Sequence, residues 1–504
     1  MFRRQLTVAL SKARPFLSRV SRKFFGRRWY HILRPAWFAL RNPSVARYAH
    51  SSPRITLVVA TYNVAPYIDA FFESVIFQRG GLAGLEVIVV DDGATDGSGM
   101  IADQWARRYP DTIRVIHQAN AGVCAARNAG LLQAKGDWIA FPDPDDILSQ
   151  DYLQRMRTEI VRPHDTPLLA VAAHIVLYFE DSGEYGNHIL RYRFARGIRR
   201  INSTDPGSMY LAHTSNTLMR RADIMKHNIR FKDTVRPSFE DADFILRLML
   251  ASPERTITFL PGPVYFYRKR ATRDSKVDLV STNKDWYGYH IKNAYLALVK
   301  DSVRLRGHVP IFIQEAIILS LIGKLRHLTS TRAILTLPSP DVAVHFHSAL
   351  TELAGFLDAD TLKTAKVPSL QSDERIVLLW YKGLCAHVPW IDVVAWRAAE
   401  NGSISICLQW FTGSEDIAPL AYIGRSDDKF PIASVLKPNT SFASIRGLQE
   451  CWLTFWPDNT LVVQRNGEPV RLRFEGKNLP DRFAPHPFFS KFVAWPMNPI
   501  EKTG

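Results

Sequence analysis

The first half of the chain alternates continuous apolar runs with amphipathic segments. Four apolar, β-branched runs end in polar or acidic residues: RITLVVATYN, LEVIVVDDG, IRVIHQ and DWIAFPD. Apolar residues at helical spacing fill the gaps between them, at 67–77, 100–109 and 125–134. Strands that are apolar throughout are buried on both faces, so this alternation predicts an α/β fold with a mainly parallel sheet. Ligands of such sheets bind beyond the carboxyl ends of the strands, where these acidic residues fall.

The hydrophobic pattern changes twice further along the chain. Three amphipathic segments between 283 and 367 predict helices. Beyond Pro368, short apolar runs such as RIVLLWYKG and ISICLQWFT predict strands of a small antiparallel β-domain, with Asn466-Gly467 as a hairpin turn. At 504 residues the chain exceeds what one core usually serves. The predicted organisation is a leader at 1–52, an α/β domain at 53–282, a helical domain at 283–368 and a β-rich accessory domain at 369–504.

The leader carries most of the excess charge. The net charge is +16, and the first 50 residues hold twelve Lys or Arg residues and no acid. Apolar residues at helical spacing between these cations predict a basic amphipathic segment that binds an anionic membrane surface through residues 1–50. A transit peptide and a leader helix that packs on the protein body are the alternatives. Nucleic-acid binding is not expected, because no reading motif accompanies the cations.

Cysteine usage and hydropathy limit the cellular setting. The four cysteines are scattered and form no CxxC pair, which argues against a zinc site or a disulfide framework and fits a reducing cytoplasm. No run of eighteen apolar residues occurs, so no membrane span is predicted. The overall composition, with 46% hydrophobic and 22% charged residues, is that of a globular protein.

The stretch FPDPDDIL places Asp143, Asp145 and Asp146 directly after an apolar run. Acids this close raise one another's pKa unless a cation lies among them. A hard divalent ion such as Mg²⁺ or Mn²⁺, shared with a substrate diphosphate, would supply that charge. The alternative is a solvated turn formed by Pro142 and Pro144.

Other polar groups follow the same strand-end pattern. VVATYN and VVDDG offer a pocket for a nucleotide base, since a carboxylate there can accept the imide N–H of uracil or an amino group of another base; its residues are Thr61, Tyr62, Asn63, Asp91 and Asp92. For the two aspartates, turn or helix capping is the alternative. In NAGVCAARNAG, Arg127 and Asn128 lie on a predicted helix, and a guanidinium matches a diphosphate. A surface arginine would be the other interpretation.

Two further segments carry clustered charge. FEDADFILRLML places Glu240, Asp241 and Asp243 in the first turn of a predicted helix, which the helix dipole alone would also favour. YFYRKRATRDS supplies cations, including Arg268, that could close over a diphosphate or bind a lipid phosphate. A solvated basic face is the alternative for that segment.

Six motifs in order, VVATYN, VIVVDDGATDGS, NAGVCAARNAG, FPDPDD, FEDADF and YFYRKR, resemble the inverting, GT-A fold glycosyltransferases of family 2. The resemblance runs from about Arg54 to Ser275 and implies a nucleotide-diphosphate sugar as donor. It implies that residues 61–63 and 91–92 contact base and ribose, and that the helix with Arg127 and Asn128 faces the donor nucleotide.

The same resemblance assigns the chemistry. The family's DxD motif falls on Asp143 and Asp145, with Asp145 as the direct metal ligand and Asp143 contacting ribose or metal through water; Pro144 departs from the small residue usual between them. Asp241 corresponds to the catalytic base, and Glu240 orients the acceptor or the base. The QxxRW segment of processive relatives is absent, so we expect transfer of one or a few sugars.

The expected function is metal-dependent transfer of a sugar, with a UDP-sugar favoured, to a glycan or lipid-linked acceptor. The middle helices are similar to those that follow this domain in bacterial enzymes of capsule and teichoic-acid-type polymer synthesis. Together with the basic leader, this similarity favours a cytoplasmic protein peripheral to the inner membrane face. The alternative is a non-catalytic carbohydrate-binding or scaffold protein that uses the tryptophans of its β-domain.

Overall fold

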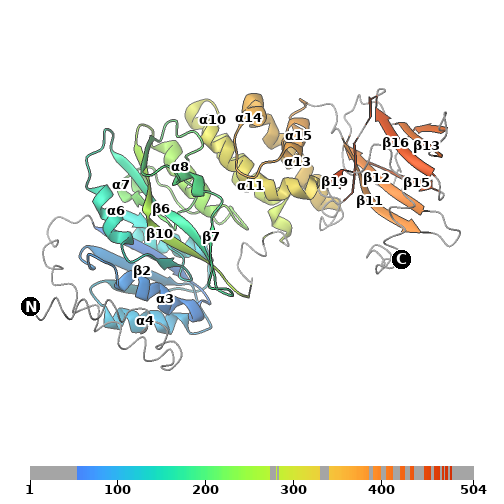
Figure 1. The fold of residues 1–504 in the computed structure, drawn as a ribbon. Helices are drawn as coiled ribbons and strands as arrows, with labels where there is room; N and C mark the ends of the chain where they lie inside the picture. Colours follow the sequence, from blue (N-terminus) through green and yellow to red (C-terminus); the bar gives the residue numbers. More distant parts are fainter. Residues whose placement is uncertain are drawn as a thin grey trace, which may run out of the picture.

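The computed structural model describes residues 54–272, 280, 283–329, 340–384 and the strands between 390 and 478. The predicted leader and the turn at 466–467 lie outside the described residues. Figure 1 shows an α/β domain, a group of helices and a strand-rich C-terminal part, with the helices between the other two.

The α/β domain is built on one ten-stranded sheet. Its strands are β1 (Ile55–Thr61), β2 (Leu85–Asp91), β3 (Ile113–His117), β4 (Trp138–Ala140), β5 (Ile147–Leu148), β6 (Leu168–Phe179), β7 (Tyr185–Asn187), β8 (Arg199–Asn202), β9 (Thr217–Arg220) and β10 (Thr256–Lys269). The main order is β3-β2-β1-β4-β9-β6-β10-β5. The first four strands are parallel, as their unbroken apolar sequences predict, whereas β9 pairs antiparallel with both β4 and β6.

Helices cover both faces of this sheet. They are α3 (Ala65–Ile76), α4 (Ser98–Arg108), α5 (Val123–Gln133), α6 (Tyr152–Ile160), α7 (Arg221–Lys226) and α8 (Glu240–Ala251). The first three confirm the helices predicted from apolar spacing. On one face α3, α4 and α6 bury Phe72, Trp105 and Leu153, and on the other α5 and α8 bury Leu131 and Ile245.

The helical part extends the buried cluster that lies on the α5 and α8 face of the sheet. Its elements are η4 (Lys284–Trp286), α9 (Gly288–His290), the π-helix η5 (Ile291–Leu296), α10 (Ala297–Arg306), α11 (Ile311–Thr329), α13 (Pro340–Phe356), α14 (Ala359–Thr364) and α15 (Ser372–Tyr381). Tyr295 and Leu321 belong to the same buried cluster as Ile245 of α8. The helices therefore pack directly on the α/β domain.

One predicted strand was wrong. RIVLLWYKG lies largely in α15, which begins with a capping box formed by Gln371 and Glu374 and buries Val377 and Leu378 on one face. A short apolar run does not distinguish a buried strand from a buried helix. Here the capping box before the run favours the helix. The helical part therefore extends beyond the predicted boundary at 368.

Strands dominate the C-terminal part, as predicted. They are β11 (Trp390–Ala398), β12 (Ile404–Phe411), β13 (Leu420–Arg425), β14 (Ile432–Val435), β15 (Leu448–Phe455), β16 (Asn459–Arg465), β17 (Glu468–Pro469), β18 (Arg471–Phe474) and β19 (Lys477–Asn478). They form sheets of five and four strands. The pairing is antiparallel except between β11 and β18, which run parallel.

Candidate active site

The carboxyl ends of the first three strands form one polar row. The parallel register places Thr61 opposite Asp91, and Asp91 opposite His117. Asp91 is buried: its Oδ1 accepts the backbone N–H of Ala94 at 3.0 Å, and its Oδ2 lies 2.9 Å from His117 Nδ1. This contact raises the pKa of His117, with burial opposing. No side chain fits at Gly99 without displacing Asp91, because a Cβ there would lie 2.3 Å from the carboxylate.

Asp92 shapes the loop that leads into α5. Its two carboxylate oxygens accept the side-chain amide of Gln118 at 2.7 Å and the backbone N–H groups of Ala121 and Gly122 at 2.9 and 2.8 Å. Asp91 thus makes the turn-capping bond that is the alternative to base binding, whereas Asp92 instead bonds to the loop before α5. Their direct contact with a nucleotide stays a prediction.

The residues after β1 differ in exposure. Thr61 is wholly buried, and its backbone oxygen accepts the N–H of Asp92 at 2.9 Å. Asn63 adopts a left-handed φ of 50° and accepts the backbone N–H of Thr95 at 2.9 Å. Tyr62, 49% exposed, is the member of this group that offers a free ring surface. The structure thus places all five predicted base-pocket residues at one edge of the sheet.

Arginines provide the positive charge among the acids of FPDPDDIL. Arg127 donates to Asp143 Oδ1 at 2.9 Å, and Arg270 donates to Asp145 Oδ2 through two nitrogens at 3.0 and 2.8 Å. Asp146 accepts the backbone N–H of Arg268 at 2.8 Å, and the Arg268 side chain donates to the backbone oxygen of Asp145 at 2.7 Å. The basic segment at the end of β10 therefore lies directly on the acidic turn.

Charge is still crowded in this turn. Burial raises the pKa of Asp143 to about 7; Arg127 lowers it, while Asp241 and Asp145 raise it further. Burial likewise raises the pKa of Asp146 well above its usual value, with Asp145 and Asp143 adding to the effect. A further cation at this position would relieve the repulsion among these carboxyl groups.

Arg127 connects this turn to the start of α8. Its guanidinium is 4% exposed and donates to Asp241 Oδ1 at 2.7 Å, with Glu240 Oε1 at 3.8 Å. The pKa of Arg127 is raised by these acids against the effect of burial. Arg127, the residue predicted to bind a diphosphate, is thus already paired with Asp143 and Asp241. Its contact with a diphosphate stays a prediction.

Asn128 points elsewhere. Its amide donates to the backbone oxygen of Phe231 at 2.8 Å and accepts the backbone N–H of the same residue at 3.0 Å. This pair of bonds holds the backbone of Phe231, whose ring centre lies 5.1 Å from the Arg127 guanidinium carbon. Asn128 therefore supports Arg127, and its predicted nucleotide contact is untested.

The segment before β9 also lies beside Asp241, which the sequence motifs do not predict. The backbone N–H of Thr214 lies 3.4 Å from Asp241 Oδ2. Next to it, burial lowers the pKa of His213 while Asp241 raises it. The polar run HTSN directly before a strand was the signal that could have identified this wall of the site.

The two predicted metal ligands, Asp143 and Asp145, lie in this acidic turn. No group of three His, Cys, Asp or Glu side chains arranged for a metal occurs among the described residues. A divalent ion that shares its shell with water and a diphosphate needs only one or two carboxylates. The side chains of Asp143 and Asp145, 33% and 18% exposed, are partly open to solvent and fit that requirement.

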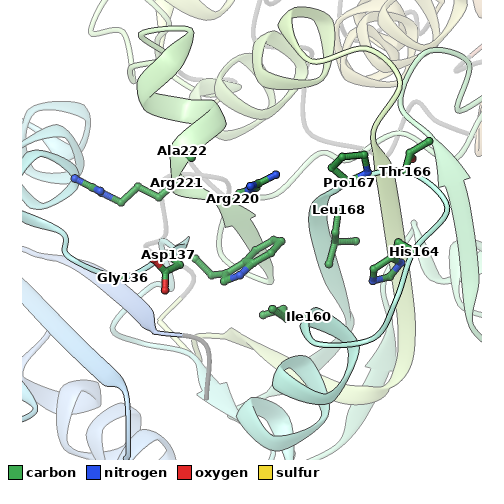
Figure 2. Close-up of a pocket in the computed structure, with 11 residues that line it drawn as sticks. Gly136, Asp137, Ile160, His164, Thr166, Pro167, Leu168, Arg220, Arg221 and Ala222 are labelled. Atoms are coloured by element: carbon green, nitrogen blue, oxygen red, sulfur yellow. The ribbon is translucent and has the colours of Figure 1, made fainter. Parts of the chain in front are cut away.

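A cavity of about 500 Å³ lies away from these residues. It is lined by residues at the amino ends of β4 and β6 and at the start of α7, among them Asp137, Leu168 and Arg221 (Figure 2). None of the predicted site residues lines it. The predicted site residues lie instead at the carboxyl ends of the strands.

The fold and the site define an α/β domain of the GT-A class with acids and arginines at its strand ends. Residues 56–227 match the family model described as Glycosyl transferase family 2. The minor teichoic acid biosynthesis protein GgaA of Bacillus subtilis (strain 168) is 30% identical over 266 residues, covering 52% of this chain and 58% of that protein. GgaB of the same organism is 28% identical over 270 residues, covering 54% and 29%.

The structure of S. aureus TarS 1–349 in complex with UDP-GlcNAc gives a TM-score of 0.50 at 17% identity, covering 66% of this chain and 88% of that one. This likeness confirms the fold. The matches to the first two relatives span 58% and 29% of their lengths. Within the described residues, every helix is too short or too polar to cross a bilayer.

Proposed function

We propose that this protein is an inverting glycosyltransferase that moves a sugar from a nucleotide-diphosphate sugar to an acceptor hydroxyl. The observation that carries the proposal is the shared guanidinium of Arg127, 2.9 Å from Asp143 and 2.7 Å from Asp241. In this proposal Asp143 faces the donor, Asp241 is the base, and Arg127 holds both. The match to family 2 supports the same reaction class.

Asp241 is the proposed general base. It takes the proton of the acceptor hydroxyl as that oxygen forms a bond to the anomeric carbon. The bond between this carbon and the diphosphate oxygen breaks, and the nucleotide diphosphate leaves with the electron pair. One displacement inverts the anomeric centre and requires no covalent sugar intermediate. Arg127 donates to Oδ1 of Asp241, and the backbone N–H of Thr214 donates to Oδ2. The two bonds together orient the carboxylate.

Asp145 and Asp143 are the proposed ligands of Mn²⁺ or Mg²⁺. When bound, the ion supplies positive charge to the departing diphosphate. Arg268 and Arg270, at the end of β10, contact the backbone and side chain of Asp145. Both are therefore placed to bind the diphosphate once Asp145 changes its partner.

The donor is proposed to be a UDP-sugar, in line with the UDP-GlcNAc in the TarS complex. The acceptor is proposed to be a glycan or lipid-linked intermediate of a bacterial surface polymer, in line with the names of GgaA and GgaB. A cytoplasmic position on the inner membrane face, through residues 1–50, completes the proposal. These assignments explain the basic leader and the polar strand ends together.

The test has two stages. Thermal unfolding of the full chain with UDP, GDP, CDP, dTDP and their sugars, each with and without Mn²⁺, identifies a donor as the ligand that raises the melting temperature only with metal. Transfer from that donor to synthetic lipid-linked and free glycan acceptors is then followed by NMR, which reports the anomeric configuration of the product. Retained configuration, or no response to any nucleotide, would refute the proposal.

A further inference from the structure

Lys324 lies in α11 and is completely buried. No described carboxylate forms an ion pair with it. Its Nζ lies 3.0 Å from His290 Nδ1 and 3.3 Å from the Tyr295 hydroxyl, and it sits 4.3 Å from the centre of the Trp286 ring. Burial lowers the pKa of Lys324 well below 10.5. Burial without a carboxylate partner disfavours the charged amine, and its two hydrogen-bonding neighbours satisfy the group in this apolar setting.

These neighbours come from the irregular start of the helical part. His290 ends α9, and Tyr295 lies in the π-helix η5, where the hydroxyl of Tyr295 also hydrogen-bonds Ser320 of α11 at 2.7 Å. Isolated π-turns inside helices are frequent at functional sites. Here the end of α9 and the π-helix present the rings of His290 and Tyr295 toward the α/β domain.

The residue that meets these rings is Phe239, which directly precedes Glu240. Its ring packs edge-on against Tyr295 at 5.0 Å and lies 6.3 Å from His290. Phe239 has φ +80°, a left-handed conformation that is strained for a bulky residue and persists only where its surroundings hold it. It is also the N-cap of α8, and its backbone oxygen accepts the N–H of Asp243 at 2.8 Å.

We propose that Lys324, His290 and Tyr295 form a positioning cluster that holds Phe239 in its left-handed conformation and thereby orients Asp241. The backbone turn at Phe239 sets the direction of the first residues of α8. A shift of this turn moves the Asp241 carboxylate relative to Arg127 and the acceptor. The inference rests on the proposed function only through the role given to Asp241.

The decisive variant is Lys324→Met, which keeps the length of the side chain and removes its hydrogen bonds. The substitution leaves His290 Nδ1 without its partner, so the melting temperature should fall modestly, as in the control below. We expect kcat to fall by about tenfold, since small misplacements of a catalytic group are costly, with the donor KM changed by about twofold or less. Hydrogen exchange at the 239–243 amides should accelerate. Tyr295→Phe, a milder change, should act in the same direction.

A double-mutant cycle separates positioning from general packing. Phe239→Gly removes both the strain and the ring, so adding Lys324→Met to it should have no further effect on kcat. The control is Gln314→Leu, in the same helix and equally buried, which loses its bonds to Val309 and Asp358. It should lower the melting temperature but leave kcat and exchange at 239–243 unchanged.

Wild-type kcat and wild-type exchange at 239–243 in Lys324→Met would overturn the inference, as would fully additive effects in the cycle. The exchange measurement requires no turnover. If the wild-type protein transferred no sugar, the proposed function would fail while the exchange data still decided whether Lys324 holds Phe239.

Discussion

Asp143 and Asp241 are held by the same guanidinium. Arg127 donates one amino group to each, at 2.9 and 2.7 Å, and is itself 4% exposed. A buried arginine that bridges two carboxylates fixes their positions more tightly than solvent would. The acid after β4 and the acid at the start of α8 are therefore held close together by one side chain.

The first prediction concerns the base. Asp241→Asn keeps the shape of the side chain and its bond from Arg127 but cannot take a proton. We expect kcat to fall by roughly a factor of 10³, within the range typical for general bases. The metal-dependent rise in melting temperature with donor should be retained. Single-turnover transfer and thermal unfolding measure the two quantities.

Glu240→Gln is the matched control for this prediction. Glu240 lies 3.8 Å from Arg127, against 2.7 Å for Asp241. Its replacement should cost much less kcat than Asp241→Asn. Full transfer by Asp241→Asn, or the larger loss in Glu240→Gln, would move the base to another residue.

The second prediction concerns the stability of the shared pair. Arg127→Met leaves Asp143 and Asp241 without their common cation, and breaking a buried ion pair from one side costs about 3–5 kcal/mol of unfolding free energy. Arg54→Met is the control, because Arg54 and its partner Asp137 have side chains that are 66% and 57% exposed. That change should cost less than about 1 kcal/mol. Equal losses in urea unfolding would contradict the role given to Arg127.

The sequence predicted the strand ends well because their signal is local. β1 and β2 end at Thr61 and Asp91, as the apolar runs indicate, and α8 begins at Glu240. The buried strand pattern and the polar stop lie within a few residues of each other. The edge of the sheet that carries the site was therefore predictable.

Which side chains pair with which was not predictable from the sequence, because the partners come from distant segments that only the fold brings together. Arg127 meets Asp241 across 114 positions of sequence, and Arg270 meets Asp145 across 125. The sequence suggested a diphosphate or a metal as the partner of each group, whereas the fold places the acids and the arginines against one another. The support of Phe239 by the helical part likewise follows from packing between distant segments.

The third prediction concerns metal affinity. Arg270 occupies Oδ2 of Asp145, the carboxylate proposed as the direct metal ligand. A charge-assisted hydrogen bond contributes about 1.5 kcal/mol or more, so Arg270→Gln should tighten Mn²⁺ binding without nucleotide by about tenfold. Affinity for the UDP-sugar should fall, because a cation for the diphosphate is lost. Titration calorimetry gives both constants.

Lys269→Gln provides the charge-matched control for Arg270→Gln. Lys269 sits 5.1 Å from the Tyr267 ring, and no described ion pair joins it to Asp145. It should change Mn²⁺ affinity much less. An equal change in the two variants would indicate general electrostatics, and weaker Mn²⁺ binding in Arg270→Gln would contradict the competition between metal and arginine.

The last prediction concerns pH and the pair His117–Asp91. The hydrogen bond to Asp91 raises the pKa of His117 above its usual 6.5, with Asp103 adding to the effect, so the folded protein binds this proton more tightly than the unfolded chain. The contribution to stability is complete below pH 6.5 and is lost as pH rises through the raised pKa. It is modest, because the His117 side chain is 53% exposed. Urea unfolding of wild type and His117→Gln should therefore differ most in acid and converge in alkali. Asp103→Asn should reduce this pH-dependent difference only in part, and a difference independent of pH would show that the ring stabilises the edge by packing alone.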